Sequence, residues 1–309
     1  MNATPILRLG TRNSPLAMAQ AVEARERLCA AHGWAQDAVE LVPVVASGDK
    51  IQDRPLADIG GKALWTKELD AWLGAGRIDA SVHSMKDVET IRPELLHIGA
   101  ILEREDKRDV LIGAPSIASI PTGARVGTSA PRRAAQMLHA RPDLEVVTFR
   151  GNVATRLAKL EAGEADVTLL AAAGLNRLGK REIGAPLDME QWLPAPAQGA
   201  IGLECRADDS ATRALLAAID HPPSRTEVMA ERALLAGLSG TCHSPIAVLA
   251  TYDGGGIDIR VALYSGDGAE RLADAARFAP GDEAALEEWA RALLGKASPA
   301  IRTNFGGEA

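Results

Sequence analysis

The chain has 309 residues, of which 47% are apolar and 24% charged, the balance of an ordinary globular protein with two or three domains. Its formal net charge of −7 argues against a nucleic-acid binder, because such proteins carry a basic excess. No apolar run reaches the roughly 18 residues of a membrane span, and three widely spaced cysteines do not suggest a disulfide framework. We therefore expect a cytoplasmic protein with reduced thiols and no membrane or nucleic-acid partner.

The first part of the chain alternates short apolar runs with helical patterns. This alternation predicts an α/β fold with a largely parallel sheet. Pro43 interrupts one strand-like run and predicts an edge position or a bend there, because proline cannot donate to a sheet ladder. Strands are expected at 6–10, 39–45, 80–83 and 96–102, and helices at 15–31 and 64–73.

The same pattern then begins again, with strands expected at 125–127, 146–150 and 167–171 and helices at 131–140 and 153–162. A short repeat supports two related lobes. Gly10-Thr11 is followed by Pro15, Ala19 and Gln20, and Gly127-Thr128 is followed by Pro131, Ala135 and Gln136.

Two proline-rich breaks divide the rest of the chain, at 193–196 and at 221–223. Between them we expect a strand at 200–205 and a helix that ends near 219. The tail predicts a small α+β domain, with helices at 225–236 and 283–294, a loop at 237–245 and two strands around residues 254–256.

Arginines recur at predicted helix starts, where acidic residues would be favoured. Arg12 precedes a helix that starts at Ser14-Pro15, Arg132 and Arg133 directly follow Pro131, and Arg156 lies in the first turn after Asn152, a good N-cap. Each such cation costs about 0.3–1 kcal/mol at low salt. An anionic ligand would offset that cost, and the planar guanidinium suits a carboxylate.

Arg150 ends its predicted strand and Arg177 follows the next one, so both point to the same sheet edge, where open α/β sheets bind ligands. The alternative is that these arginines are solvated surface charges, or pair with acids such as Glu161. The glycine-containing loops do not spell a phosphate-binding signature.

Asp87 follows a predicted strand at the same edge and can stabilise a cation or shuttle a proton. The alternative is a surface pair between Lys86 and Asp87. Cys29 and Cys205 fit core positions, whereas Cys242 lies in a loop, as an inert thiol or a reactive one. Histidine spacing suggests no metal site, and Asp49 with residues 60–62 suggests a mobile loop over a cleft.

Segments along nearly the whole chain resemble the porphobilinogen deaminase (hydroxymethylbilane synthase) family. The most specific are the stretch from His83 to Asp87 and the ordered arginines. The matching segments are 8–17, 61–69, 82–88, 126–129, 132–133, 150–153, 173–179, 198–200, Cys242 and 245–246.

The resemblance implies two lobes like those of periplasmic binding proteins, with mixed, largely parallel sheets. Residues 1–102 and 199–219 would form the first lobe with the catalytic aspartate, and 103–198 the arginine-rich second lobe. Residues 220–309 would form the α+β domain that carries the cofactor-attachment cysteine.

The resemblance also implies a transferase that acts as a monomer and joins four porphobilinogen units, with loss of ammonia, into hydroxymethylbilane for porphyrin and haem biosynthesis. Its cofactor would be a dipyrromethane bound to Cys242 by a thioether, with neither metal nor nucleotide. Asp87 would be the catalytic carboxylate, and Lys62 and Trp65 would belong to a lid or an aromatic face. The remaining residues would hold substrate and cofactor carboxylates: Arg12, Ser14, Lys86, Thr128, Ser129, Arg132, Arg133, Arg150, Asn152, Arg156 and Arg177.

Several positions depart from the usual family pattern. Ala197 and Thr241 stand where glycine is usual, and Glu89 stands where proline is frequent. Ala130 lacks a hydroxyl that is common there, and Pro131 should stiffen a helix start. None of these changes removes a charged catalytic group.

Two other functions fit parts of the pattern. A two-lobed binding or sensor protein would share the fold and an anion site, but would release its ligand unchanged. A cysteine acyl-transfer enzyme would use Cys242 with a histidine such as His243. Formation of product from porphobilinogen alone would exclude both.

Overall fold

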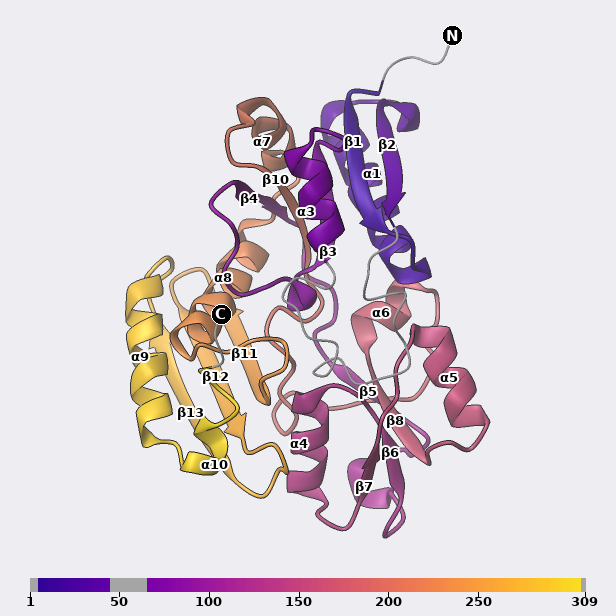
Figure 1. Ribbon diagram of the computed structural model, residues 1–309, viewed down its shortest axis with the longest axis vertical. Helices are drawn as coiled ribbons and strands as arrows, with labels where there is room; N and C mark the ends of the chain where they lie inside the picture. Colours follow the sequence, from indigo (N-terminus) through magenta and orange to yellow (C-terminus); the bar gives the residue numbers. More distant parts are fainter. Residues whose placement is uncertain (1–4, 45–65, 307–309) are drawn as a thin grey trace. The chain divides into compact units, whose positions relative to one another are not determined.

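The computed structural model describes residues 5–44 and 66–306, and these form two compact units. The first unit contains 5–44, 66–105 and Gly199–Arg225. The second contains Asp106–Gln198 and 226–306. The chain therefore leaves the first unit, returns to it and leaves it again, as its colours show in Figure 1.

The first unit is built on a mixed five-stranded sheet in the order β2-β1-β3-β10-β4. β1 is parallel to β2 and to β3, whereas β10 runs antiparallel to β3 and β4. β2 lies at the edge, as Pro43 predicted. The strands are β1 (Leu7–Arg12), β2 (Val39–Val44), β3 (Ala80–Ser84), β4 (Leu96–Ile101) and β10 (Ile201–Arg206).

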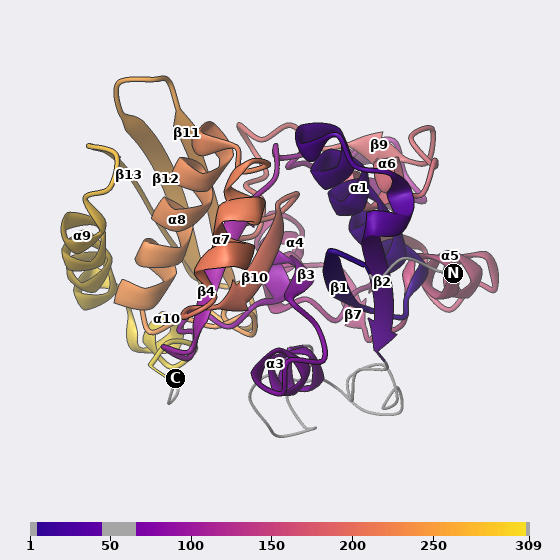
Figure 2. The same cartoon turned by 90° about the horizontal axis from the view of Figure 1, so that it is seen from above.

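Helices cover both faces of this sheet, because successive side chains of a strand point to opposite faces. Leu7 and Leu9 of β1 pack with Leu28 of α1, and Gly10 faces Leu69 of α3. Figure 2 shows α1 and α3 on opposite sides of β1. The helices of this unit are α1 (Pro15–His32), α3 (Lys67–Gly74) and α7 (Ser210–Ala217), with single turns η1 (Gln36–Ala38) and η3 (Met85–Asp87).

The first sheet of the second unit repeats the same plan in the order β7-β6-β8-β5-β9. The first three strands are parallel and β5 runs antiparallel to its neighbours β8 and β9. The two sheets thus share one topology, as the sequence repeat predicted. The elements are β5 (Asp109–Ile112), η4 (Ile117–Ser119), β6 (Arg125–Gly127), α4 (Pro131–Ala140), β7 (Glu145–Val147), α5 (Val153–Glu161), β8 (Val167–Ala171), α6 (Ala172–Arg177) and β9 (Ala185–Pro186).

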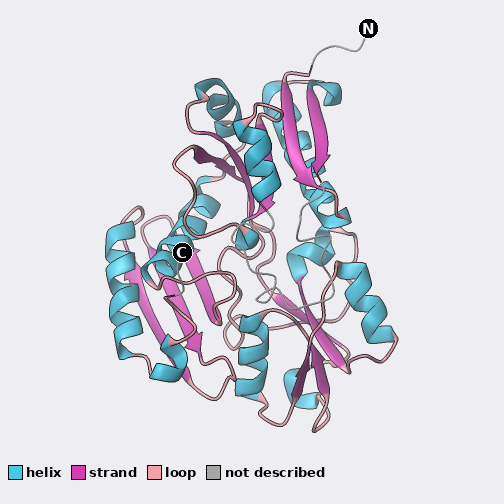
Figure 3. Ribbon diagram, viewed as in Figure 1, coloured by secondary structure: helices cyan, strands magenta, loops and turns pink. Residues whose placement is uncertain are grey.

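The C-terminal part of the second unit has an antiparallel three-stranded sheet in the order β11-β12-β13 (Figure 3). One face of this sheet packs on α8 and α9. Its other face contributes Ala247, Leu249 and Tyr264 to a cluster that also contains Ala135 of α4. The elements are α8 (Pro222–Gly237), β11 (Ile246–Tyr252), β12 (Ile257–Tyr264), β13 (Arg271–Phe278), α9 (Glu283–Lys296) and α10 (Pro299–Arg302).

The predicted α/β class is confirmed, and most predicted elements are present within a few residues of their expected bounds. β5, β9 and β13 were not predicted. β5 is an aspartate followed by three apolar residues without alternation, and β13 alternates but is rich in alanine, which has weak strand preference. β7 ends at Val147 rather than at residue 150, so the end of that strand was predicted wrongly.

Candidate active site

In the first unit, the predicted site residues lie at the carboxyl edge of the sheet. Leu9 and Gly10 of β1 lie opposite Ala80 and Ser81 of β3, so the two parallel strands end together. Arg12 ends β1, and the turn Met85–Asp87 directly follows β3. The fold therefore brings Arg12, Ser14, Lys86 and Asp87 to one edge, as predicted.

The start of α1 is tied to this edge by side-chain hydrogen bonds. Ser14 caps the helix by accepting a bond from the Ala17 backbone N–H at 3.2 Å. The buried Gln20 side chain donates to the Ser84 hydroxyl at 2.8 Å. The first turn of α1 contains no acidic residue, so no acid of that turn offsets the partial positive charge of the helix start.

Asp87 itself is half-buried. No residue in 5–44 or 66–306 forms a hydrogen bond or ion pair with its carboxylate. The Lys86–Asp87 surface pair that the sequence left open does not form. A carboxylate without an internal cation is suited to a positive charge on a ligand.

In the second unit, the loops after β6, β7 and β8 meet at one edge because these neighbouring strands are parallel. The first turns of α4, α5 and α6 contain no acidic residue. Pro131 is the first residue of α4 and Asn152 caps α5, as predicted. The residues at this edge are Thr128, Ser129, Arg132, Arg133, Arg150, Asn152, Arg156 and Arg177.

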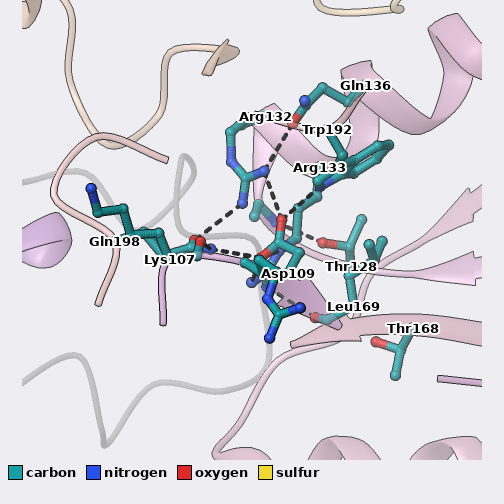
Figure 4. A network of polar contacts seen from close by, with 12 residues as sticks. Lys107, Asp109, Thr128, Arg132, Arg133, Gln136, Thr168, Leu169, Trp192 and Gln198 are labelled. Atoms are coloured by element: carbon teal, nitrogen blue, oxygen red, sulfur yellow. Dashed lines mark hydrogen bonds and ion pairs between the residues drawn. The ribbon is translucent and has the colours of Figure 1, made fainter. Parts of the chain in front are cut away.

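Arg132 and Arg133 bind an internal acid, Asp109, which is fully buried at the start of β5 (Figure 4). The Arg132 Nη1 lies 2.7 Å from Oδ2, and the Arg133 Nη2 lies 2.7 Å from Oδ1. The indole N–H of Trp192 donates to Oδ2 at 2.8 Å, and the Gln198 amide donates to Oδ1 at 3.0 Å. Four side chains thus satisfy one carboxylate.

The same two guanidiniums also bind the surrounding backbone. Arg133 donates to the Leu169 carbonyl of β8 at 2.9 Å, while Arg132 donates to the Gln136 side chain at 2.8 Å and to the Leu193 carbonyl at 3.2 Å. The Arg132 Nε–H is buried and has no acceptor among the described residues. α4 is therefore anchored to β5, β8 and the chain near residue 193.

The charges in this network depend on each other. Burial by itself would raise the pKa of the Asp109 carboxyl, but the two guanidiniums outweigh it and hold that pKa far below its ordinary value. Burial lowers the pKa of Arg132, against the attraction of Asp109 and with the repulsion of Arg133. The interpretation of Arg132 and Arg133 as solvated surface charges is thereby excluded, since each is only 5% exposed.

Asp109, Trp192 and Gln198 were not predicted as partners of these arginines. The available signal was an acidic residue placed directly before the apolar run Val110–Ile112, where a buried charge requires a cation.

The other arginines of this edge differ in environment. Arg150 is buried, and it lies three residues beyond the end of β7. Arg156 is half-buried and donates through Nε to the Gly151 carbonyl at 3.0 Å. The Ser129 hydroxyl donates to the Phe149 carbonyl at 2.8 Å, which joins the loops after β6 and β7.

Cys242 lies on a braced turn between α8 and β11. Its side chain is exposed, whereas Cys29 and Cys205 are buried as predicted. Ser244 fixes the turn, since its hydroxyl accepts from the Thr241 N–H at 3.1 Å and donates to the Asn304 carbonyl at 2.9 Å. The structure thus presents one thiol to solvent from a rigid base.

Two predicted residues, Lys62 and Trp65, lie outside the described residues, as do Asp49 and the loop at 60–62. Within 5–44 and 66–306, no group of three histidine, cysteine, aspartate or glutamate side chains is placed to bind a metal. No helix in the described part of the chain combines the length and apolar character of a membrane span.

Known proteins resemble the chain over nearly its whole length. Residues 7–214 match the family model "Porphobilinogen deaminase, dipyromethane cofactor binding domain", and residues 225–286 match "Porphobilinogen deaminase, C-terminal domain". A porphobilinogen deaminase of Sphingopyxis alaskensis is 57% identical over 305 residues, which cover 97% of this chain and 96% of the relative. A porphobilinogen deaminase of Paracoccus denitrificans is 50% identical over 296 residues, covering 94% of each chain.

Among solved structures, a periplasmic substrate-binding protein of an ABC transporter from Coxiella burnetii is 15% identical. It covers 70% of this chain and 92% of its own, with a TM-score of 0.41.

The role of Asp109 can be tested with Asp109→Asn. Removing one charge leaves two buried guanidiniums without their anion, so we expect a loss of about 3–5 kcal/mol in the free energy of unfolding at pH 7. Because the pKa of Asp109 is depressed in the folded state, the deficit should persist down to about pH 4 and shrink only below it.

Urea denaturation of both proteins between pH 7 and pH 2.5 measures this deficit. Asp143→Asn, at the exposed pair with Arg141, is the matched control and should leave the midpoint unchanged. Equal midpoints for Asp109→Asn and the wild type at pH 7 would contradict the assignment.

Burial also predicts which thiols react. In a Cys242→Ser variant, we expect native protein at pH 8 to take up no iodoacetamide and protein in urea to take up two equivalents. Burial raises the pKa of Cys205 to about 11, so roughly one thiol in a thousand is ionised at that pH. Mass spectrometry counts the label, and labelling of the native variant would show that the core positions are wrong.

Proposed function

Because the chain belongs to the porphobilinogen deaminase family, we propose that Asp87 is its catalytic carboxylate and Cys242 its cofactor-attachment residue. The chain is a transferase of porphyrin and haem biosynthesis with a dipyrromethane cofactor. It joins four porphobilinogen units into hydroxymethylbilane and releases ammonia. The observation that carries this conclusion is the 57% identity over 97% of the chain.

The residues present fit the cofactor. A thioether requires a thiol that an incoming pyrrole can reach, and Cys242 is the exposed cysteine, on a turn fixed by Ser244 and Asn304. Thr241, in place of the usual glycine, is accommodated because its hydroxyl accepts a bond from the His243 N–H at 3.2 Å. When bound, the dipyrromethane supplies the pyrrole carbon to which the substrate is joined.

Residues at the carboxyl edges of the two sheets would bind the carboxylates of the substrate and the cofactor. Porphobilinogen carries an acetate and a propionate, and each charge-assisted hydrogen bond to such a group contributes about 1.5–3 kcal/mol. In the second unit, the binding residues would be Thr128, Ser129, Arg132, Arg133, Arg150, Asn152, Arg156 and Arg177. In the first unit, they would be Arg12, Ser14 and Lys86.

Arg132 and Arg133 would act in this set from fixed positions. Asp109 forms an ion pair with each guanidinium and so fixes its rotamer. Binding of a ligand therefore costs little side-chain conformational entropy at these two residues. The first turns of α4, α5 and α6 contain no acidic residue, which supports the proposed binding role.

Asp87 would stabilise the positive charge that develops on the pyrrole nitrogen of the substrate when ammonia leaves. Its carboxylate would also take and return protons at that nitrogen. In support, the side chain is half-buried and no described residue neutralises it. Lys86, the preceding residue, would bind carboxylates rather than pair with Asp87.

We further propose three domains: residues 1–102 with 199–219, residues 103–198, and residues 220–309. Three separate sheets and two family matches, which end at residue 214 and begin at residue 225, support this division. We also propose that the enzyme works as a cytoplasmic monomer. Lys62 and Trp65 remain predictions for a lid or an aromatic face.

Replacement of Asp87 tests its catalytic role. We expect Asp87→Ala to remain folded and loaded with cofactor while turnover of porphobilinogen falls about 10²–10⁴-fold, the usual contribution of a positioned acid–base group. Glu94→Ala removes an exposed acid of the same segment and should keep normal turnover. Near-normal turnover of Asp87→Ala would remove this residue from the mechanism.

The attachment residue can be identified by intact mass. Purified wild-type protein should exceed the mass of the chain by two pyrrole units, and Cys242→Ser should show the mass of the chain alone. Cys205→Ala is the control and should keep the added mass, because that thiol is buried. Added mass on Cys242→Ser would show that the cofactor is attached elsewhere.

A further inference from the structure

A second buried acid, Glu204 of β10, lies beside the turn that carries Asp87. Its side chain is fully buried. Arg92 binds it with two prongs, from Nε to Oε1 at 2.9 Å and from Nη2 to Oε2 at 3.0 Å. The His83 Nε2 lies 3.2 Å from Oε2. One carboxylate therefore joins a residue of β3 to a residue beyond the turn.

The two partners of Glu204 flank Asp87 in the sequence. His83 lies on β3 four residues before Asp87, and Arg92 lies five residues after it. Since β10 is paired with β3 through Gly202 and His83, the acid is held in register with the strand that ends at the turn. Both ends of the segment 83–92 are thereby fixed to one strand.

The middle of this segment is fixed to β10 as well. The Met85 N–H donates to the Ala200 carbonyl at 3.1 Å, and the Met85 side chain is buried against Gly202. A Cβ on Gly202 would lie 2.1 Å from the Met85 sulfur, so only glycine leaves room for that side chain. Asp87 follows two residues later on the same turn.

Arg92 also binds two acids of its own surroundings. Its Nη2 lies 2.7 Å from Asp70 and its Nη1 lies 2.5 Å from Glu89, which also accepts a bond from Thr66 at 2.9 Å. Burial would raise the pKa of Glu204, but His83 and Arg92 lower it to about 2. Burial raises the pKa of Asp70, and the contact with Arg92 offsets only part of that effect.

An arrangement of this kind is not an efficient source of stability. Buried ion pairs recover little more than their desolvation cost, and apolar residues of similar volume often serve as well. The cluster does define geometry, because the guanidinium can satisfy three acids in one orientation only. Its place around the segment 83–92 therefore favours a role in positioning.

Position 89 lies on the same segment, two residues after Asp87. Glu89 accepts a hydrogen bond from Arg92. The guanidinium therefore also restrains the backbone just after the turn.

We infer that Arg92 is a positioning residue, which acts through Glu204 and Glu89 to hold the Asp87 carboxylate in its working place. This inference rests on the proposed role of Asp87. The guanidinium closes the segment 83–92 onto β10, and the turn then presents Asp87 with little freedom. A displacement of about 1 Å at a reacting group can cost 10²-fold in rate.

The test compares Arg92→Leu and Arg92→Lys with the wild-type holoenzyme. We expect Arg92→Leu to lower kcat about 10²-fold with KM for porphobilinogen changed less than about threefold, because carboxylate binding is untouched. Arg92→Lys keeps the charge but not the two-pronged contact, so its kcat should lie between those of the wild type and Arg92→Leu. Intact mass should show the cofactor in every variant.

Two further readouts separate positioning from folding. Hydrogen exchange at the Met85 and Val88 amides, measured by mass spectrometry, should quicken in Arg92→Leu. Adding Glu89→Pro to Arg92→Leu should recover part of kcat, since Val88 already has the extended backbone, φ −92° and ψ 132°, that precedes a proline. A purely structural loss would not be rescued at the turn.

Arg8→Leu is the matched control. Arg8 makes a two-pronged pair with Asp79, at 2.7 and 3.0 Å. Asp79 directly precedes the first residue of β3, whereas Asp87 follows the last one. That variant should keep kcat and the exchange rates of the turn. Equal losses in Arg8→Leu and Arg92→Leu would overturn the inference.

The outcomes also distinguish this inference from the proposed function. Normal turnover in Asp87→Ala would refute the role of Asp87 itself. If Asp87→Ala abolishes turnover while Arg92→Leu leaves kcat and amide exchange unchanged, only the positioning role fails. In an Asp87→Glu background, where the carboxylate is already displaced, Arg92→Leu should cost less than about fivefold, and a full 10²-fold loss there would also overturn it.

Discussion

The second unit depends on the contact between Asp109 and the guanidiniums of Arg132 and Arg133. This acid starts β5, and through its partners it joins α4, β8 and the chain near Trp192 and Gln198. A buried charge of this kind tolerates no loss of a partner, because an uncompensated ion in the interior costs several kcal/mol. The start of α4, which also forms part of the proposed carboxylate site, is therefore as rigid as the strand to which it is bound.

The first unit has a buried acid–arginine contact at the same place in its topology. β10 and β5 are both the fourth strand of their sheets, and both run antiparallel to the strand that precedes the site. Each carries a fully buried acid, Glu204 or Asp109, whose arginine partners come from the loop or helix at the carboxyl edge. One acid contacts the segment around Asp87 and the other contacts two arginines proposed to bind carboxylates, so both sheets place a buried acid–arginine contact at the same strand.

Sequence reasoning reached the local features of this design and missed the long-range ones. The turn at Asp87, the proline at the start of α4 and the cap at Asn152 follow from neighbouring residues, and all are present. The pairing of Asp109 with Arg133, 24 positions away, and of Glu204 with Arg92, 112 positions away, depends on which strands become neighbours. The periodicity of apolar residues does not specify which strands become neighbours. A single sequence also offers no related sequences in which paired changes at two positions would reveal the contact. For this reason the sequence leaves Arg132 and Arg133 as binding residues, surface charges or partners of an acid such as Glu161, and does not identify Asp109 as their partner.

The departures from the family pattern follow the same principle on a smaller scale. Ala197 stands where glycine is usual and adopts φ +56°, a left-handed conformation that costs a residue with a Cβ about 1 kcal/mol. Its N–H donates to the buried Glu231 carboxylate at 2.6 Å, and the other oxygen of Glu231 accepts from the Ala250 N–H at 3.0 Å. A charge-assisted bond to a backbone N–H contributes more than that strain costs. Helix α8, which ends five residues before Cys242, thus holds the chain segment that leads from the second unit back to the first. At position 197 a carboxylate with two fixed backbone donors thus restrains the chain, next to a segment on which the proposed chemistry depends.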